Sequence, residues 1–167
     1  MNTELLRSLT TKEIETYHRD GVLLLKNMFD ADWIKLLNKG LDLNCKSPTE
    51  RSRIWDKDDA GHTMFYDTLA WRKIEEYKKF IFDSPAAQIC GQLMKATTVN
   101  YFFDAVFVRS HGTKFETPWH QDEPYWSIEG YDACTLWMPL VPVKEKNCLS
   151  FVPGSHRFKS VFNQSNI

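Results

Sequence analysis

The chain has 167 residues and a formal net charge of −1, and its acidic and basic residues are mixed along the sequence. Hydrophobic residues make up 43% and charged residues 26%, the balance of a globular protein with a buried core. No basic stripe indicates a nucleic-acid surface, and the longest aliphatic run, Val22–Leu25, is too short to cross a membrane. Residues 1–19 include acids and no apolar segment of the secretory kind, so we expect a cytoplasmic protein.

Cysteine spacing indicates neither a disulfide framework nor a zinc site. The chain has four cysteines, and none forms a CxxC pair. Widely separated cysteines of this kind are typical of reduced thiols in the cytoplasm. They are Cys45, Cys90, Cys134 and Cys148.

The N-terminal part, residues 1–96, is predicted to be mostly helical with one early strand. Thr10 followed by Glu13 has the form of a capping box, in which each side chain bonds to the backbone of the other residue. The helix is expected to end at Gly21, because glycine readily adopts the left-handed cap conformation. Val22–Leu25 then reads as a short buried strand.

Three further helices are predicted before residue 96. Asp30 is a capping residue for the first of them, which we expect Gly40 to close. Residues 44–63 are polar and lack a sustained hydrophobic period, which predicts a loop. Two helices follow over residues 67–80 and 85–94, and a Ser-Pro pair marks the start of the second.

From residue 97 the sequence becomes rich in β-branched and aromatic residues. Val99–Val108, Cys134–Val143 and Leu149–Val152 read as strands of a sandwich or barrel. Since no Gly/Ser/Pro-rich spacer precedes them, residues 97–167 are expected to form one domain with the helical part, covering residues 1–167.

The segment 117–122, TPWHQD, contains the chemistry-bearing residues. In an extended strand His120 and Asp122 project from the same face and offer a ring nitrogen and a carboxylate oxygen. These are two of the three ligands of the facial triad that holds non-haem Fe(II) and leaves coordination positions open. A His-x-Asp spacing alone is equally consistent with a surface strand and a local hydrogen bond. Aromatic residues flank the segment and suit either an apolar substrate cleft or plain core packing: Trp119, Tyr125 and Trp126.

The 117–122 segment belongs to a series of three sequence motifs. WHQD at 119–122 is followed by the apolar run ACTLWMPL at 133–140 and by FVPGSHR at 151–157. This series resembles the phytanoyl-CoA dioxygenase family of Fe(II)/2-oxoglutarate-dependent oxygenases. The stretches DGVLLLKN at 20–27 and FDSP at 82–85 also look like parts of that family, so the resemblance covers nearly the whole chain.

The resemblance implies an α+β or mainly β fold, an incomplete double-stranded β-helix (jelly roll, cupin-like) with N-terminal helices packed on one side. It implies Fe(II), with 2-oxoglutarate as cosubstrate, and a reaction of O2 with a small-molecule substrate. His120 and Asp122 match the iron ligands, and a carboxylate at Asp122 is typical of hydroxylases. Trp137 matches a position beside 2-oxoglutarate, with a core aromatic as the alternative. Arg109 matches a weaker cosubstrate contact, with a solvated charge as the alternative.

The family's distal histidine ligand and its 2-oxoglutarate arginine have no matching positions before Ile167. His156 is the substitute third ligand that the sequence offers, although its family counterpart lies in a turn and is not a ligand. A jelly roll uses about eight strands, and about five are predicted here. We therefore expect either a fragment of a longer protein or a homo-oligomer formed through the open sheet edge. The rival function is a catalytically inactive oxygenase-like domain that binds a ligand or a protein.

Overall fold

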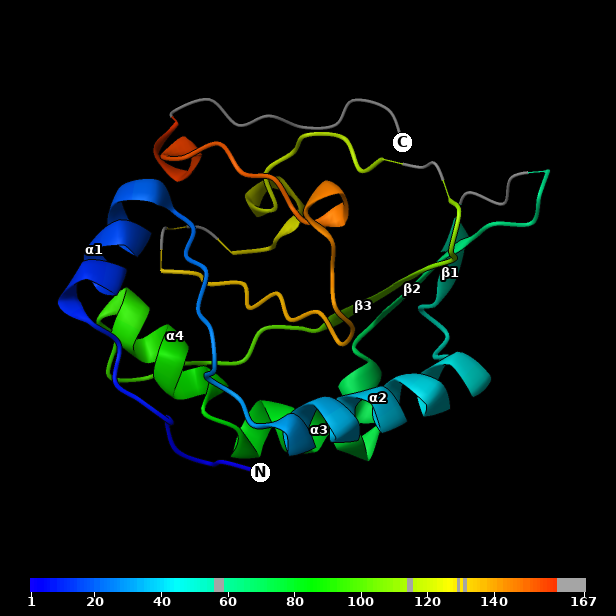
Figure 1. Cartoon of the computed structure of the whole chain (residues 1–167), viewed down its shortest axis with the longest axis horizontal. Helices are drawn as coiled ribbons and strands as arrows, with labels where there is room; N and C mark the ends of the chain where they lie inside the picture. The colour runs from blue at the N-terminus through cyan, green and yellow to red at the C-terminus, as the bar shows by residue number, and fades with distance from the viewer. Residues whose placement is uncertain (56–58, 114–115, 129, 131, 159–167) are drawn as a thin grey trace.

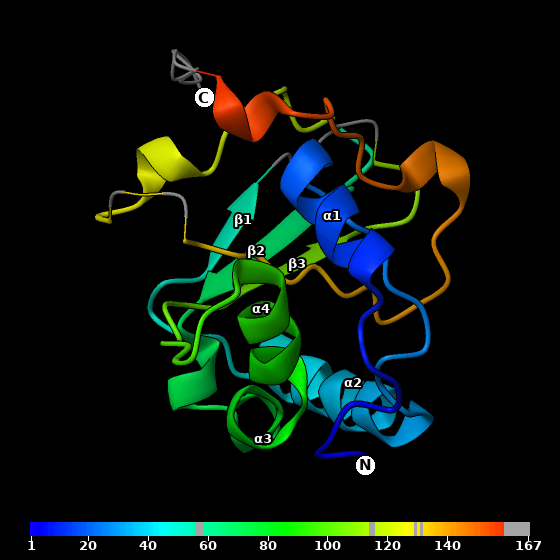
Figure 2. The same ribbon diagram turned by 90° about the vertical axis from the view of Figure 1, so that its left-hand side faces the viewer.

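A computed structural model of the chain describes residues 1–55, 59–113, 116–128, 130 and 132–158. Within these residues, four α-helices accompany one three-stranded antiparallel sheet (Figure 1). The helices are α1 (Thr11–Asp20), α2 (Ala31–Lys46), α3 (Glu75–Asp83) and α4 (Ala86–Met94); the strands are β1 (Arg53–Trp55), β2 (Met64–Thr68) and β3 (Ala105–Arg109). Figure 2 shows the three strands in the order β1-β2-β3, with α2 and α3 below them. No helix in the described part of the chain is long and apolar enough to span a membrane.

Helix α1 begins and ends as its sequence predicts. The hydroxyl of Thr10 accepts a hydrogen bond from the amide of Glu13 at 3.2 Å, and the Glu13 carboxylate accepts one from the amide of Thr10 at 2.8 Å. A hydrogen bond from Arg7, together with the Thr10 amide, lowers the pKa of Glu13 to about 2. Gly21 has φ 76° and ψ 3°, the left-handed cap that glycine adopts without a steric cost.

Helix α2 starts at its predicted cap but does not end at the predicted glycine. The Asp30 carboxylate accepts hydrogen bonds from two amides of the first turn. Gly40, in contrast, lies in the middle of α2, which continues to Lys46, so the predicted end was wrong. A Cβ at Gly40 would lie 2.9 Å from atoms of both Glu76 and Tyr77 in α3. Glycine is therefore needed here for close helix packing rather than for a cap.

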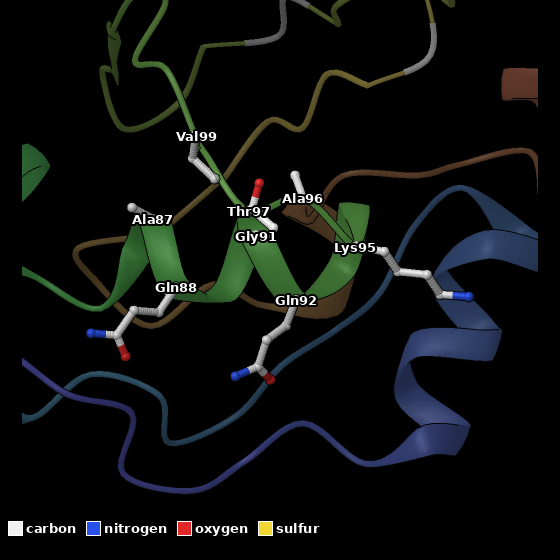
Figure 3. A pocket seen from close by; sticks show the side chains of 8 residues that line it. All are labelled: Ala87, Gln88, Gly91, Gln92, Lys95, Ala96, Thr97 and Val99. Carbon is white, nitrogen blue, oxygen red and sulfur yellow. The ribbon is translucent and has the colours of Figure 1, made fainter.

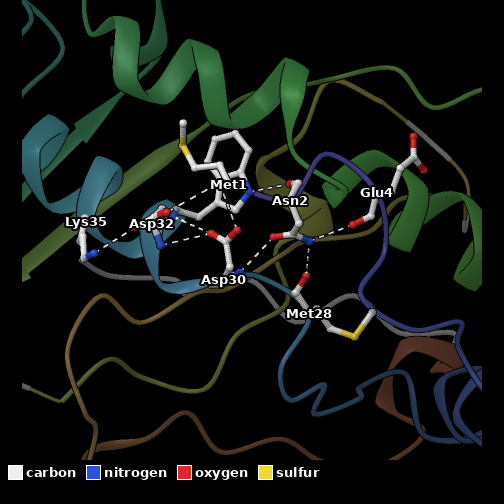
Figure 4. A network of polar contacts seen from close by, with 8 residues as sticks. Met1, Asn2, Glu4, Met28, Asp30, Asp32 and Lys35 are labelled. Atoms are coloured by element: carbon white, nitrogen blue, oxygen red, sulfur yellow. Dashed lines mark hydrogen bonds and ion pairs between the residues drawn. The ribbon is translucent and has the colours of Figure 1, made fainter.

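The N-terminal segment is fixed onto the start of α2 through Asn2 (Figure 4). The side-chain nitrogen of Asn2 donates to the backbone carbonyl of Met28 at 3.1 Å, and its side-chain oxygen accepts from the backbone amide of Asp30 at 3.0 Å. The backbone carbonyl of Asn2 accepts from the indole nitrogen of Trp33 at 2.7 Å. Because Trp33 is fully buried, this bond satisfies a donor that water cannot reach.

Two of the three strands lie where the sequence predicted other structure. β1 falls within the predicted loop 44–63, and β2 occupies residues at the start of the predicted helix 67–80. Only a short 3₁₀ turn, Ala70–Arg72, separates β2 from α3, which begins at Glu75. The period of such a short run does not distinguish helix from strand, and pairing with β1 and β3 decides the outcome.

Asp67 joins β2 to the end of α2 and to the following loop. Its fully buried carboxylate accepts hydrogen bonds from the Asn44 side chain at 2.7 Å and from the Thr49 and Thr68 amides, each at 2.9 Å. The Thr49 hydroxyl is a further donor. Burial acts to raise the pKa of Asp67, but these hydrogen bonds outweigh it, and the pKa lies below its ordinary value.

Three predicted strands are wrong. Val22–Leu25, 134–143 and 149–152 contain no strand residue, and of the predicted Val99–Val108 strand only residues 105–108 lie in a strand, β3. The first of these segments is only partly buried, because Leu24 is 78% exposed whereas Leu23 and Leu25 pack against the core. The physical reason is that an apolar run becomes a strand only when another backbone pairs with it, and the described residues provide no partner for these three.

The core consists of two apolar clusters that draw on both halves of the chain. One surrounds the buried residues Leu9, Met28, Ile89 and Leu93, and Cys134 packs against it. The other surrounds Leu37, Ala70, Ile74 and Tyr77, and Val106, Met138 and Leu140 pack against it. Helix α4 begins at Ala86, one residue after the predicted start, with Pro85 at the cap position, and the hydroxyl of Ser84 accepts from the amide of Ala86 at 3.3 Å.

Candidate metal centre

The 117–122 segment does not form the strand that the sequence predicted. None of its residues belongs to a strand, and Asp122 has φ −74° and ψ −35°, a helical conformation. Asp122 directly precedes a 3₁₀ turn, Glu123–Tyr125, which has Pro124 in its first residues. The alternation argument used to bring His120 and Asp122 together was therefore wrong for this backbone.

A turn nevertheless brings the two side chains together. Nε2 of His120 lies 3.3 Å from Oδ1 of Asp122. On the other side of the ring, Nδ1 lies 2.8 Å from the carbonyl oxygen of Pro118. Because a carbonyl oxygen can only accept a hydrogen bond, Nδ1 must carry the proton. A neutral His120 then directs the lone pair of Nε2 toward the Asp122 carboxylate.

Two acceptors facing each other at this distance require a positive charge between them, either a proton or a cation. Two donors bound at right angles to one metal at about 2.1 Å lie about 3 Å apart, close to the observed separation. A backbone carbonyl that holds the second ring nitrogen is also the usual outer partner of a metal-bound histidine. The donor pair thus fits a divalent metal such as Fe(II), and side-chain exposures of 32% and 52% keep it accessible from solvent.

The turn that carries His156, the candidate substitute ligand, reaches the 117–122 segment, because the Gln121 side chain donates to the carbonyl of Ser155 at 3.5 Å, but the His156 ring lies against α1. The ring packs on Gly21, where a Cβ would come within 2.2 Å of the ring Nδ1. The amide of Gly154 donates to the carbonyl of Asp20 at 2.7 Å, so the 153–157 turn is attached to the end of α1 (Figure 1). Within the described residues no three His, Cys, Asp or Glu side chains form a metal-binding group. In the described structure the contacts of His156 are with the end of α1 rather than with His120 or Asp122, as expected for a residue whose family counterpart lies in a turn.

Arg109 connects the sheet to the candidate centre. It is the last residue of β3, and its guanidinium donates to the hydroxyl of Thr117, three residues before His120. Trp137, the other predicted cosubstrate contact, is 47% exposed in a segment without regular structure. No measured contact joins Trp137 to the His120–Asp122 pair, so its placement beside a cosubstrate stays a prediction.

One predicted cleft aromatic, Tyr125, contacts His120, and one aromatic residue was missed by the sequence analysis. The Tyr125 ring centroid lies 6.5 Å from that of His120, and Trp126 packs edge-on against Phe102 at 6.1 Å. Trp119, the third predicted cleft residue, is 69% exposed. The missed residue is Tyr66 on β2, whose pKa is raised by burial and then by nearby negative charges that include Asp122.

A hollow lies along α4, and none of the proposed site residues lines it (Figure 3). It has a volume of about 550 Å³ and is lined mainly by small residues such as Gly91 and Ala96. Its two glutamines bond to the N-terminal segment: Gln88 donates to the carbonyl of Thr3, and Gln92 accepts from the amide of Leu9. With no histidine or carboxylate in its lining, this hollow offers no metal ligand.

The sequence was compared with known protein families. The sequence pattern of the family described as phytanoyl-CoA dioxygenase (PhyH) matches residues 17–164, nearly the whole chain. No curated protein and no solved structure gave a match. The matched range includes the WHQD segment at 119–122 and the PGSHR segment at 153–157. The chain therefore belongs to the phytanoyl-CoA dioxygenase family.

Proposed function

We propose that this chain is an Fe(II)- and 2-oxoglutarate-dependent dioxygenase that uses O2 to hydroxylate an unactivated C–H bond of a small molecule. Its family supports the general oxygenase class. The observation that carries the proposal is the His120–Asp122 pair, with Nε2 and Oδ1 3.3 Å apart. A ring nitrogen and a carboxylate are the donor types of the facial triad that leaves iron positions open for other ligands.

Three residues of the chain have assigned roles at this centre. His120 Nε2 and Asp122 Oδ1 are the metal-binding atoms, and the Pro118 carbonyl holds the imidazole in the tautomer that metal binding requires. Bound iron, together with 2-oxoglutarate and O2, would supply the oxidising power that no side chain has. The 3₁₀ turn after Asp122 fixes its backbone, because the amide of Tyr125 donates to the carbonyl of Asp122 at 3.0 Å.

Arg109 is proposed to bind a carboxylate of 2-oxoglutarate, with Trp137 beside the same molecule. The hydrogen bond from Arg109 to Thr117 holds the guanidinium near the His120 segment. An arginine suits this role because its planar guanidinium donates two parallel hydrogen bonds to one carboxylate. A third protein ligand for the metal is not found among the described residues.

The finer architectural proposals follow the family. We propose that residues 1–167 form one cytoplasmic domain and contribute the first part of a jelly roll. β1 and β3 are the edges of the observed sheet, and we propose that the chain self-associates through one of them. Sedimentation over a hundredfold range of concentrations is the measurement, and a monomer at every concentration contradicts association.

A second candidate function is favoured by the incomplete ligand set. The described residues offer two clustered donors rather than three, which suits a binding domain that has lost catalysis. This reading predicts no metal-dependent product and a stability that chelators do not change.

An anaerobic titration with Fe(II) and 2-oxoglutarate tests the site. The wild type is expected to develop the visible metal-to-ligand charge-transfer band, and His120→Ala and Asp122→Ala are expected to lose it. His156→Ala, which removes a ring packed on Gly21, is expected to retain the band. His18→Ala is the matched control, because His18 is an exposed histidine on α1. A band that survives in His120→Ala, or none in the wild type, contradicts the proposed centre.

Succinate formation separates the two functions. With iron, 2-oxoglutarate and O2, the dioxygenase forms succinate from 2-oxoglutarate, and His120→Ala abolishes this turnover. A wild-type protein that forms the band but no succinate would support the binding domain instead.

A further inference from the structure

One face of the sheet carries a continuous row of aromatic rings. Side chains alternate between the two faces of a strand, so one aromatic per strand can lie on the same face. Trp55 of β1 stacks on Tyr66 of β2 with ring centroids 4.8 Å apart and planes at 17°. Tyr66 in turn contacts Phe107 of β3 at 4.9 Å and 40°. We call Trp55, Tyr66 and Phe107 the aromatic row.

The row is accessible at both of its ends, whereas the opposite face of the sheet is covered in part. Trp55 is 40% and Phe107 is 55% exposed. On the other face, Val106 packs against the apolar cluster that contains residues of α2 and α3. Two exposed rings flank the half-buried ring of Tyr66, and a contiguous apolar patch of this kind is typical of a binding site.

The row adjoins the candidate metal centre. Arg109 lies two residues after Phe107 on β3, and it bonds to the segment that carries His120. A molecule lying on the row is therefore beside the proposed metal ligands.

Positive charge accompanies the rings. Arg53 pairs with Tyr66 in the β1–β2 register and lies two residues before Trp55, so it is on the face of the row. Its guanidinium donates to the carbonyl of Ser52 at 2.8 Å, which places the group at the exposed edge of the sheet. A guanidinium on the same face of the sheet as the rings complements a ligand that combines a flat apolar body with an anionic group.

We propose that the aromatic row and Arg53 bind the substrate of the dioxygenase reaction, and that this substrate is a planar aromatic carboxylate. Its ring lies against Trp55 and Phe107, and its carboxylate pairs with Arg53. The role as substrate rests on the function proposed above, whereas binding to the row does not require metal. An aliphatic acid is expected to bind the row more weakly, because contacts between aromatic rings add attraction beyond the burial of apolar area. A cationic ligand is disfavoured by Arg53.

Calorimetric titration with 2-naphthoate in the presence of EDTA tests the binding. EDTA removes the metal, so a failed iron site and a failed aromatic row give separate results. Trp55→Leu and Phe107→Leu are expected to raise the Kd for 2-naphthoate roughly three- to tenfold, the usual effect of losing one ring contact. Ile54→Ala is the matched control, since Ile54 lies between Arg53 and Trp55 on the opposite face and is 67% exposed. Its Kd is expected to equal that of the wild type.

Matched probes test the charge and the ring. Arg53→Gln is expected to weaken 2-naphthoate several-fold and to leave the neutral 2-naphthylmethanol unchanged. Cyclohexanecarboxylate is expected to bind the wild type more weakly than 2-naphthoate. Circular dichroism of each variant confirms that it is folded before its Kd is compared.

Three results would overturn the proposal. One is an equal Kd for 2-naphthoate in Ile54→Ala and in both ring variants. Another is tighter binding of 2-naphthylmethylammonium than of 2-naphthoate. The third is a wild type that binds no 2-naphthoate. If a second copy of the chain covers the row, tryptophan emission changes on dilution.

Discussion

Replacing Asp67 by asparagine removes the charge that joins β2, α2 and the intervening loop while keeping the side-chain shape. One carboxylate oxygen accepts from the Asn44 side chain and the Thr49 amide, and the other accepts from the Thr68 amide and the Thr49 hydroxyl. An amide keeps only one acceptor oxygen. Placing its NH2 toward the Thr49 hydroxyl, which can accept, leaves the Thr68 amide without a partner.

The magnitude follows from this loss. One unsatisfied donor next to a buried group costs about 1–3 kcal/mol, and the remaining bonds weaken because they are no longer charge-assisted. We therefore expect Asp67→Asn to lower the free energy of unfolding by about 2–4 kcal/mol at pH 7. Urea denaturation followed by circular dichroism measures the loss.

The free energy of unfolding lost in Asp67→Asn depends on pH, and the lowered pKa of Asp67 determines the direction of that dependence. Burial opposes that shift, and the hydrogen bonds from Thr49 and Asn44 outweigh it. A carboxylate whose pKa is lower in the folded state contributes stability above its unfolded pKa of about 3.9 and loses it as the pH falls through the folded value. The difference between wild type and Asp67→Asn is therefore full at pH 7 and shrinks below about pH 4.

Asp83→Asn is the matched control. Asp83 is 47% exposed and pairs with Lys79 at 2.7 Å on the surface of α3, and such exposed pairs contribute at most about 0.5 kcal/mol. A loss in Asp67→Asn no larger than this, or a loss that stays constant down to pH 3, refutes the reasoning.

Three further substitutions test single contacts by urea denaturation. Gly40→Ala is expected to destabilise by about 1–3 kcal/mol despite the higher helix propensity of alanine, because its methyl group clashes with Tyr77 in α3. Asn2→Ala is expected to lower the free energy of unfolding by about 1–3 kcal/mol. It removes the side-chain hydrogen bonds to Met28 and Asp30 that hold the N-terminal segment in place, and the backbone carbonyl of this segment accepts from the Trp33 indole. Thr10→Ala is expected to cost about 1 kcal/mol through loss of the α1 cap.

Each of these three substitutions has a control variant or a result that would contradict the expectation. Thr10→Ser retains the capping hydroxyl and should remain within about 0.5 kcal/mol of the wild type. A Gly40→Ala variant more stable than the wild type would show that helix propensity outweighs the contact with Tyr77. An Asn2→Ala variant of unchanged stability would show that the N-terminal segment does not hold the start of α2.

Local chemistry made some elements predictable from sequence. The capping box at Thr10, the cap at Asp30 and the left-handed Gly21 depend on interactions within a few residues, and all three are confirmed. The family, too, was identified from motifs and their order, and the match over residues 17–164 confirms it.

The sequence also identified His120 and Asp122 as neighbours for a reason that was wrong. It predicted an alternating strand, whereas a turn into a 3₁₀ helix brings Nε2 and Oδ1 to 3.3 Å. Spacing alone did not reveal the Pro118 carbonyl that fixes the ring, because a backbone acceptor has no residue-type signal.

What the sequence by itself determined was therefore the set of local caps, the family and the chemical types of the site residues. The tertiary structure decided which apolar runs became strands, because ladder hydrogen bonds require a partner from a distant part of the chain. It also showed that Gly40 packs between helices and that His156 docks on Gly21. It assembled the aromatic row from β1, β2 and β3 as well, and contacts between such distant residues leave no period in the sequence.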